Sequence, residues 1–385
     1  MNTEVNAEIK ENKKLLKGKA AVLLNANENY KVEEVEIDEL REDEVLVKIV
    51  ASGICHSDEV VRNGDSPNPM PVILGHEGSG IVEKVGSHVK NIKPGDHVVL
   101  SFGYCGTCPS CLTGVAASCD EWLHLNLADQ RDDGVPYYRR LDGTPIAHWN
   151  QSTFAEYTIV KPSHVTKVDP TVDLRLVGPL GCGFLTGSGT IFNGLKPEPG
   201  STIAVYGTGA VGLATMMAAK IAGCSKIIGI DIHDHRLETA MELGATHTIN
   251  SKTEDLKQKI SEFTYGRGTN YAVDTTGVPM VIRSALESLA VGGTIAPIAA
   301  TRTMEINTMF DLSFYNKTMK GILMGQAIPQ LTIPQLIEFY KEGRFMFDKL
   351  VKFYQFEDIN QANEDSKSGK TIKPILIIDK TYKPE

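Results

Sequence analysis

Short apolar runs alternate with turn residues in the first part of the chain. Between about residues 19 and 160, runs with the residue types of β-strands are separated by segments rich in Gly, Pro, Asn and Asp. The expected strands are residues 20–24, 30–37, 44–51, 80–85 and 97–100. This pattern predicts a β-rich domain.

The pattern changes to strand, helix, strand between about residues 184 and 326. An apolar run at 202–206 leads into a glycine-rich turn, and an Ala, Met and Leu-rich segment at 210–222 has helical character. A second apolar run follows at 226–230. Alternation at this spacing favours a parallel sheet with crossover helices, and therefore an α/β domain.

The last part of the chain, about residues 327–385, has few predicted elements. It contains a predicted helix at 333–341 and an apolar strand at 375–378. Because a terminal strand needs a sheet to join, we expect this segment to return to the first domain. Residues 1–183 and 327–385 would then form one domain and residues 184–326 the other.

Composition and charge exclude several classes of protein. The 385 residues are 42% hydrophobic and 23% charged, as in ordinary globular proteins, which excludes a disordered chain, a collagen and a coiled coil. The net charge of −9 argues against a nucleic-acid binder, which needs a basic face. The chain has no apolar run of about 18 residues and its N-terminus has no secretory pattern, so we expect a cytoplasmic protein without membrane contact.

A phosphate-binding turn is predicted at residues 207–212. The segment fits G-x-G-x-x-G, with Gly207 for the tight turn, Gly209 for close approach to a pyrophosphate and Gly212 for helix packing. Together with Ala210 and Val211, it would present free N–H groups to the phosphates. The alternative is a glycine turn without a ligand.

An acidic residue ends the next predicted strand. Asp231 lies 19 residues after Gly212, where a carboxylate can accept hydrogen bonds from the adenosine ribose. Because a carboxylate repels a 2′-phosphate, the sequence predicts NAD in preference to NADP. Arg236 either contacts the ribose or adenine, or is a solvated helix residue.

Four cysteines stand close together in a Gly, Pro and Ser-rich stretch. Cys105, Cys108, Cys111 and Cys119 can close a tetrahedron around Zn²⁺ with no open position, which is typical of a structural site. An iron–sulfur cluster is the first alternative, but its fourth cysteine normally follows after three residues and precedes a proline. Unliganded buried cysteines are the second alternative.

Three further residues suggest a second metal site. Cys55, His76 and Cys182 are flanked by glycines, and the last stands just before the predicted α/β domain. Two thiolates and one imidazole leave a fourth zinc position open, as a catalytic zinc requires. Each residue alone is more often an ordinary core or surface residue. Cys224 remains and is interpreted as a structural thiol.

Taken together, these motifs resemble the zinc-dependent medium-chain alcohol dehydrogenases over about residues 17–379. The similar segments are residues 53–58, 75–77, 93–96, the four-cysteine loop, 181–183 and 207–212. The resemblance implies a GroES-like catalytic domain interrupted by a doubly wound Rossmann domain. It also implies an NAD-dependent oxidoreductase with two Zn²⁺ per chain.

The resemblance assigns roles by position. Cys55, His76 and Cys182 match the catalytic zinc ligands, and Glu77 matches a carboxylate that approaches the metal from behind. Asp58 matches the acid that orients the ligating histidine, and Ser57 matches the hydroxyl that takes the alcohol proton. Four residues match cofactor contacts: His56 at the pyrophosphate, Thr186 near the nicotinamide, Arg236 at the adenosine ribose and Lys373 near the pyrophosphate.

Two positions depart from the family pattern. Val60 stands where the proton relay often ends in a histidine, so the proton must leave Ser57 through a ribose hydroxyl and water, or through His56. Ser101 stands where a bulky aromatic often narrows the substrate pocket, so we expect room for a wider alcohol.

The substrate class and the oligomer follow from the same resemblance. Residues 178–183 and 347–374 most resemble the aryl-alcohol (benzyl-alcohol) dehydrogenase branch, which oxidises primary aryl or allylic alcohols to aldehydes and catalyses the reverse reduction. The alternatives are a general short-chain primary alcohol dehydrogenase, a formaldehyde dehydrogenase and a catalytically silent relative. The length of the loop after the four cysteines favours a homodimer over a homotetramer.

Overall fold

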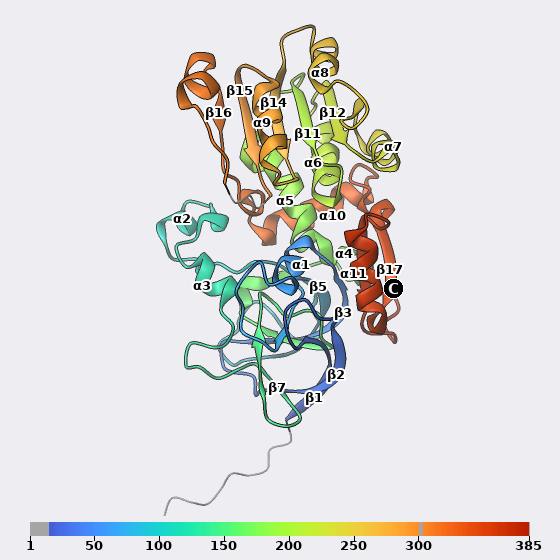
Figure 1. Ribbon diagram of the computed structural model, residues 1–385. Coiled ribbons are helices and arrows are strands. Elements are labelled where there is room, and N and C mark those ends of the chain that lie inside the picture. Colours follow the sequence, from blue (N-terminus) through green and yellow to red (C-terminus); the bar gives the residue numbers. More distant parts are fainter. Residues whose placement is uncertain (1–14, 300–302, 385) are drawn as a thin grey trace, which may run out of the picture.

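Figure 1 shows the computed structural model, which describes residues 15–299 and 303–384. The upper body in this view, coloured green to orange, is built on one sheet. The lower body contains the N-terminal strands, and the red C-terminal segment lies against it. The chain therefore leaves the lower body, forms the upper one and comes back.

The lower body contains a barrel and a mixed sheet. Within the described residues, the closed barrel has the order β1 (Leu16–Leu23), β2 (Lys31–Ile37), β7 (Tyr138–Arg140), β8 (Pro145–His148), β4 (Val72–Ile73). The mixed sheet has the order β10 (Val165–Lys167), β6 (His97–Leu100), β5 (Glu77–Val85), β3 (Val45–Gly53), β18 (Lys373–Ile377), β17 (Val351–Gln355), and β9 (Tyr157–Val160) also pairs with β3.

The upper body is a parallel sheet. Its order, in the part of the chain described, is β13 (His247–Asn250), β12 (Lys226–Asp231), β11 (Thr202–Tyr206), β14 (Thr269–Asp274), β15 (Leu289–Pro297), β16 (Thr318–Met319). Counted along the chain, this is the order 3-2-1-4-5-6 of a dinucleotide-binding fold. The direction of winding reverses between β11 and β14, and in such sheets ligands bind outside the carboxyl ends at that point.

Helices cover the sheets and connect them. The α-helices are α1 (His56–Arg62), α2 (Pro109–Leu112), α3 (Trp122–Leu127), α4 (Leu174–Val177), α5 (Gly183–Gly189), α6 (Ala210–Ile221), α7 (Asp234–Leu243), α8 (Leu256–Thr264), α9 (Pro279–Glu287), α10 (Pro329–Lys341) and α11 (Ile359–Lys367). Short 3₁₀ segments include η1 (Ala116–Ser118), η3 (Gly178–Gly181) and η7 (Met324–Gln326). Among the helices described, none is long and apolar enough to cross a membrane.

The predicted elements are present, with shifted ends. The predicted helix at 333–341 begins four residues earlier, at Pro329. Proline is favoured at the first helical position, because an N–H there would have no partner within the helix. The terminal strand returns to the first domain as expected: Ile375 of β18 lies opposite Gly53 of β3 in an antiparallel pair. The exact domain boundaries at 183 and 327 stay a prediction.

Close helix packing connects the two bodies. Gly187 of α5 lies against the carbonyl oxygen of Val211 in α6, where a Cβ atom would not fit. Helix α5 follows directly after Cys182, and α6 follows the glycine turn. This contact therefore fixes the segment of Cys182 relative to the glycine turn.

A buried ion-pair network anchors the loop before β7. The guanidinium of Arg131 donates to both carboxylate oxygens of Glu44, at 2.7 and 2.8 Å, and to Asp38 at 2.6 Å. The side chain of Arg131 is 2% exposed and that of Glu44 is fully buried. Because a buried charge is stable only when it is paired, each partner depends on the other.

We therefore expect Arg131→Met to destabilise the protein by up to about 3–5 kcal/mol, since the buried Glu44 would lose its guanidinium partner and keep only the N–H of Arg41 and the ammonium of Lys161 at 3.9 Å. The double variant Arg131→Met/Glu44→Leu should recover a large part of the loss. Urea unfolding would measure both. A single variant that loses less than about 1 kcal/mol would contradict this account of the loop.

Candidate active site

The glycine turn opens into a cavity between the two bodies. Gly207 has φ of +89°, a conformation that favours glycine, and a Cβ at Gly212 would meet the carbonyl oxygen of Gly207. The cavity has a volume of about 470 Å³. Its wall includes nine of the predicted site residues: Cys55, His56, Gly207, Gly209, Ala210, Val211, Asp231, Arg236 and Lys373.

Asp231 is held firmly at the end of β12. Its Oδ2 accepts hydrogen bonds from the backbone N–H and the hydroxyl of Thr208, both at 2.8 Å. Its Oδ1 accepts from the N–H groups of Ile232 and His233, at 2.7 and 3.1 Å. Burial raises the pKa of Asp231, but these donors outweigh it and hold the pKa below its usual value. The carboxylate is therefore ionised.

Three of the predicted metal ligands lie together. Sγ of Cys55 and Sγ of Cys182 are 4.0 Å apart. One ligand atom each from Cys55, His76, Glu77 and Cys182 lies within 4.8 Å of the others. Cys55 is the N-cap of α1, His76 precedes β5 and Cys182 precedes α5, so three separate segments converge here.

A single carboxylate connects two of these segments. Asp58 is fully buried, and its Oδ1 accepts hydrogen bonds from Nδ1 of His76 and from the N–H of Gly75, both at 3.1 Å. Its Oδ2 accepts from the N–H of Cys55 at 3.0 Å, which closes the N-terminus of α1. With Nδ1 facing Asp58, the Nε2 atom of His76 is the free ligand atom.

Glu77 and Lys373 form a buried ion pair behind the cluster. Nζ of Lys373 donates to both carboxylate oxygens of Glu77, at 3.0 and 2.9 Å, and to the carbonyl of Ile54 at 3.0 Å. The two side chains are at most 4% exposed. Lys373 lies in the cavity wall, as its predicted role requires, but its charge is directed at Glu77.

The buried charges shift several pKa values. Hydrogen bonding to Cys182, the most important cause, lowers the pKa of Cys55 well below its usual value, and the same bond raises the pKa of Cys182. Burial opposes charge on His76, yet Asp58 and Cys55 raise its pKa. Burial raises the pKa of Glu77 to about 7. A negatively charged thiolate beside an imidazole favours the binding of a cation.

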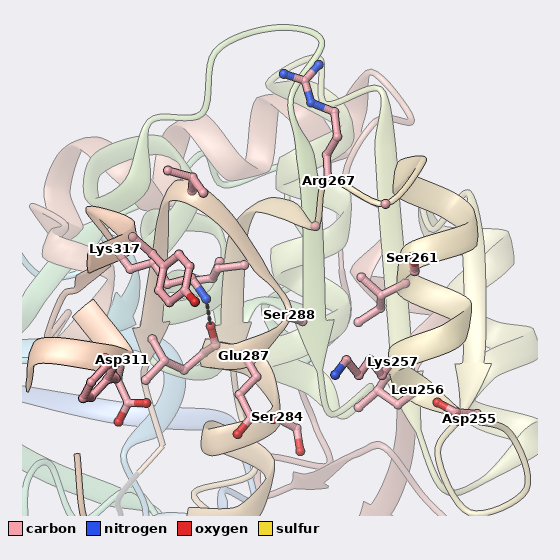
Figure 2. Close-up of a pocket in the computed structure, with 18 residues that line it drawn as sticks. Asp255, Leu256, Lys257, Ser261, Arg267, Ser284, Glu287, Ser288, Asp311 and Lys317 are labelled. Carbon is pink, nitrogen blue, oxygen red and sulfur yellow. Dashed lines mark hydrogen bonds between the residues drawn. The ribbon is translucent and has the colours of Figure 1, made fainter. Parts of the chain in front are cut away.

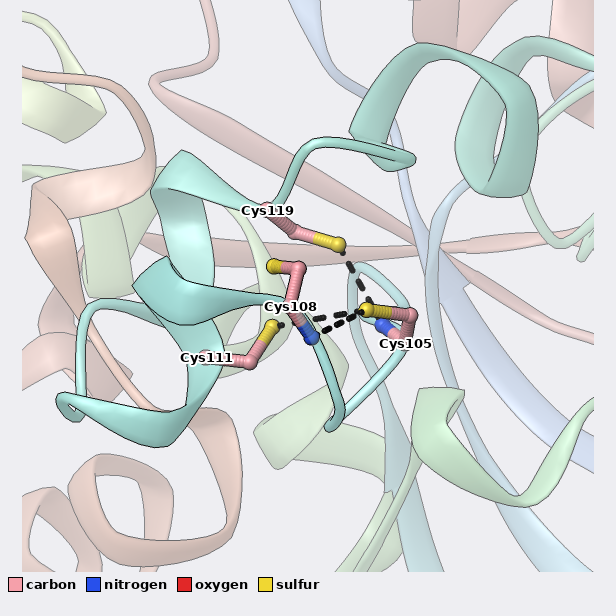
Figure 3. Close-up of side chains that lie close together, drawn as sticks. All are labelled: Cys105, Cys108, Cys111 and Cys119. Carbon is pink, nitrogen blue, oxygen red and sulfur yellow. Dashed lines mark hydrogen bonds between the residues drawn. The ribbon is translucent and has the colours of Figure 1, made fainter.

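The four remaining clustered cysteines meet in a lobe beside α2 (Figure 3). Sγ of Cys105 lies 3.9 Å from Sγ of Cys111, and the N–H of Cys105 points at Sγ of Cys119 at 3.3 Å. Sγ of Cys105 accepts hydrogen bonds from the N–H groups of Thr107 and Cys108. These donors, Thr107 first, lower the pKa of Cys105 to about 6.

Both clusters fit zinc by their donor sets. Four sulfurs within 4.8 Å of one another form a closed site for a tetrahedral ion. Two sulfurs and one imidazole nitrogen form a site with an open position. N–H donors directed at sulfur favour thiolates, which are the metal-binding form of cysteine.

The other predicted residues surround the cluster. Oγ of Ser57 lies 3.9 Å from Sγ of Cys55, and His56 is exposed at the cavity. Thr186 lies on α5 with its hydroxyl 3.8 Å from the sulfur of Met324, outside the cavity wall. The ring of Trp149 lies edge to face against the ring of His76, with 5.1 Å between centroids.

Ser101 does not have the predicted role. It is 1% exposed and its hydroxyl donates to the carbonyl of Gly181 at 2.6 Å, so it lines no open pocket. The expectation that Ser101 widens the pocket is therefore wrong. The residue instead connects the end of β6 to the segment of Cys182. Motif spacing could not reveal this, because the bond joins positions 80 residues apart.

A larger cavity lies elsewhere. It has a volume of about 700 Å³ and lies in the upper body, between α8, α9 and the chain near Lys317 (Figure 2). Nζ of Lys317 donates to the carbonyl of Leu286 there. None of the predicted metal or cofactor residues lines this cavity. Size alone therefore does not identify the active site.

Comparison with known proteins identifies the family. Residues 41–170 match the family described as alcohol dehydrogenase GroES-like domain, and residues 210–342 match zinc-binding dehydrogenase. The chain is 39% identical over 370 residues to geraniol dehydrogenase of Castellaniella defragrans, covering 94% of this chain and 98% of the relative. This chain belongs to the zinc-binding alcohol dehydrogenase family.

Two other members of the zinc-binding alcohol dehydrogenase family are similar along the whole chain. The crystal structure of benzyl alcohol dehydrogenase from Acinetobacter calcoaceticus has a TM-score of 0.90 and 42% identity, covering 94% of this chain and 100% of that one. The NDMA-dependent alcohol dehydrogenase of Amycolatopsis methanolica is 35% identical over 370 residues, covering 94% and 99%. The family's two domains, GroES-like and Rossmann, are those of the structure.

We expect Cys108→Ser to reduce stability, because three remaining ligands hold zinc poorly and a closed site contributes folding energy. The variant should melt at a lower temperature and contain about one zinc fewer per chain by metal analysis. Cys224→Ser, which changes a half-buried cysteine outside both clusters, is the matched control and should keep its metal. Unchanged melting and zinc content in the first variant would refute the structural site.

Proposed function

We propose that this protein oxidises primary aryl or allylic alcohols to aldehydes, and catalyses the reverse reduction, with NAD and two zinc ions per chain. The observation that carries the proposal is the shared cavity. The same wall contains Cys55 of the ligand cluster, the glycine turn and Asp231. A dinucleotide bound along this wall would extend from the ribose site at Asp231 to the metal ligands.

The ligand cluster supports a metal-assisted reaction. Cys55, His76 and Cys182 would hold a zinc ion that, when bound, supplies Lewis-acid chemistry and lowers the pKa of an alcohol toward neutrality. Asp58 keeps the imidazole of His76 in one orientation. The ion pair between Glu77 and Lys373 lies behind the candidate ligands, and the ammonium of Lys373 neutralises the carboxylate of Glu77.

Ser57 is the residue we propose to take the alcohol proton. Its hydroxyl lies 3.9 Å from a ligand sulfur on the exposed first turn of α1, within reach of a substrate beside the metal. Val60 cannot carry the proton further. From Ser57 the proton would pass to His56, which lies in the same cavity wall, or to water, and a cofactor bound there would offer a ribose hydroxyl as a further acceptor.

Cofactor contacts are proposed from the same wall. NAD, when bound there, accepts the hydride. The turn from Gly207 to Gly212, with Gly209, Ala210 and Val211, offers the N–H groups at the start of α6 to the pyrophosphate. Asp231 and Arg236 would contact the adenosine ribose, and Thr186 would pack near the nicotinamide. His56 and Lys373 would lie near the pyrophosphate.

Relatives and local chemistry support the substrate class. Two similar proteins bear the names geraniol dehydrogenase and benzyl alcohol dehydrogenase, which denote allylic and aryl alcohols. In this chain the indole of Trp149 lies beside His76 and provides an aromatic surface next to the ligands. The space at Ser101, which the sequence suggested, contributes nothing to this argument.

Two further properties belong to the proposal. Seven cysteines, all free in the structure, suit a reducing compartment, so we propose a cytoplasmic protein. Strand β16 is the last strand of its sheet, and exposed Phe310 and Phe314 precede it in the chain. An edge strand and exposed apolar side chains in the segment before it support a homo-oligomer, a dimer in the first instance.

We expect kcat/KM for benzyl alcohol, cinnamyl alcohol and geraniol to exceed that for ethanol at least tenfold. Burial of a larger apolar group gains roughly 25 cal/mol per Å², and part of this gain is realised in the transition state. Hexanol, which is long but neither aromatic nor allylic, is the control for the size of the apolar group. A panel in which ethanol matches the aromatic alcohols would favour a general primary alcohol dehydrogenase.

We expect the wild type to use NAD rather than NADP, and Asp231→Ser to relax this preference without reversing it. The substitution removes a like-charge repulsion against the 2′-phosphate. Steady-state kinetics with both cofactors would test this. An artificial electron acceptor belongs in the same assay, because one relative is NDMA-dependent. Equal use of both cofactors by the wild type would overturn the interpretation of Asp231.

A further inference from the structure

Four donors hold the carboxylate of Asp231 in the structure. Two come from Thr208, its backbone N–H and its hydroxyl, and two are the backbone N–H groups of Ile232 and His233. Only the hydroxyl of Thr208 is a side-chain donor. It alone can be removed by substitution without changing the backbone.

A cation lies beside this carboxylate with part of its hydrogen-bonding capacity unused. Nη1 of Arg236 is 4.0 Å from Oδ2 of Asp231. Within the described residues, the buried Nε of Arg236 has no hydrogen-bond partner. A guanidinium with free donors is suited to a phosphate. The ribose end of the cavity therefore contains both a group that repels a 2′-phosphate and a group that would attract one.

The outcome depends on whether the carboxylate can turn away. A carboxylate with rotational freedom could move toward Arg236 and leave space for a phosphate. Each oxygen is held by two donors, and loss of the Thr208 hydroxyl would leave Oδ2, which lies 4.0 Å from Arg236, with a single backbone donor. Thr208 is fully buried, so its hydroxyl has no bulk water to compete for it.

We propose that Thr208 is a specificity-determining residue: its hydroxyl locks the Asp231 carboxylate in the orientation that accepts ribose hydroxyls and rejects a 2′-phosphate. This inference rests on the proposed function, in which the adenosine ribose binds at Asp231. Thr208 itself acts through Asp231 and is a positioning residue. It occupies a variable position of the glycine motif, which is why the motif did not reveal it.

The test is the ratio of the dissociation constants for NADP and NAD, measured by calorimetric titration of the zinc-loaded protein. Thr208→Val removes the hydroxyl and keeps the shape, and we expect the ratio to fall about tenfold, the value of one hydrogen bond to a charged group. Thr208→Ser keeps the hydroxyl and should stay within about twofold of the wild type.

Thr215→Val is the matched control. Thr215 is also fully buried in the upper body, and its hydroxyl donates to the carbonyls of Val211 and Gly187, at 2.9 and 3.3 Å, without contact to Asp231. In Thr215→Val the ratio of the dissociation constants for NADP and NAD should be unchanged, even if the variant melts at a lower temperature. Thr208→Ala provides a second variant should Thr208→Val fail to fold.

The outcomes separate the inference from the function on which it rests. A wild type that prefers NAD, with an unchanged ratio in the valine and alanine variants, would overturn the inference alone. A wild type that binds no dinucleotide, or prefers NADP, would overturn both. A fall of similar size in Thr208→Ser or Thr215→Val would show that the effect is not due to the hydroxyl.

Discussion

The candidate active site depends on one buried carboxylate. Asp58 accepts hydrogen bonds from the backbone of Cys55, from the backbone of Gly75 and from the ring of His76. A carboxylate without partners would be very costly at this depth, so the three donors must stay where they are. The same bonds close the first turn of α1 and set the orientation of the imidazole. The bond between Asp58 and His76, which are 18 positions apart in the chain, thus joins the segments of Cys55 and His76 into one rigid unit.

The third candidate ligand, Cys182, and the ion pair behind the ligands come from later parts of the chain. Cys182 enters at the junction before α5, and the β18 strand brings Lys373 against Glu77. The C-terminal segment therefore does more than complete a sheet. Its lysine neutralises the carboxylate behind the candidate ligands, and it also lies in the wall of the cavity at the glycine turn.

Local motifs were predictable from the sequence, because they depend on spacing within one segment. The residues of the glycine turn and of the four-cysteine loop are neighbours in the chain, and Asp231 follows the turn at a fixed spacing within one strand–turn–helix–strand unit. Cys55, His76 and Cys182 lie far apart in the chain. Their combination was suggested by flanking glycines and by the family resemblance, and it requires the fold to bring them together.

The remaining features could not be predicted, because tertiary contacts decide them. Ser101 was expected to line a pocket, but its hydroxyl donates to the carbonyl of Gly181, a contact between the segment after β6 and η3. Lys373 was expected at the pyrophosphate, and its ion pair with Glu77 depends on the pairing of β18 with β3. The bond from Thr208 to Asp231 joins two strand ends, and a pattern of residue types contains no sign of it.

The central claim is that Cys55, His76 and Cys182 form a catalytic metal site separate from the four-cysteine site. Anomalous diffraction from crystals of the purified protein, recorded on both sides of the zinc absorption edge, tests this most directly. The account predicts two zinc peaks per chain, one among Cys105, Cys108, Cys111 and Cys119 and one among Cys55, His76 and Cys182. A fully metal-loaded protein with a peak only at the four cysteines would contradict it.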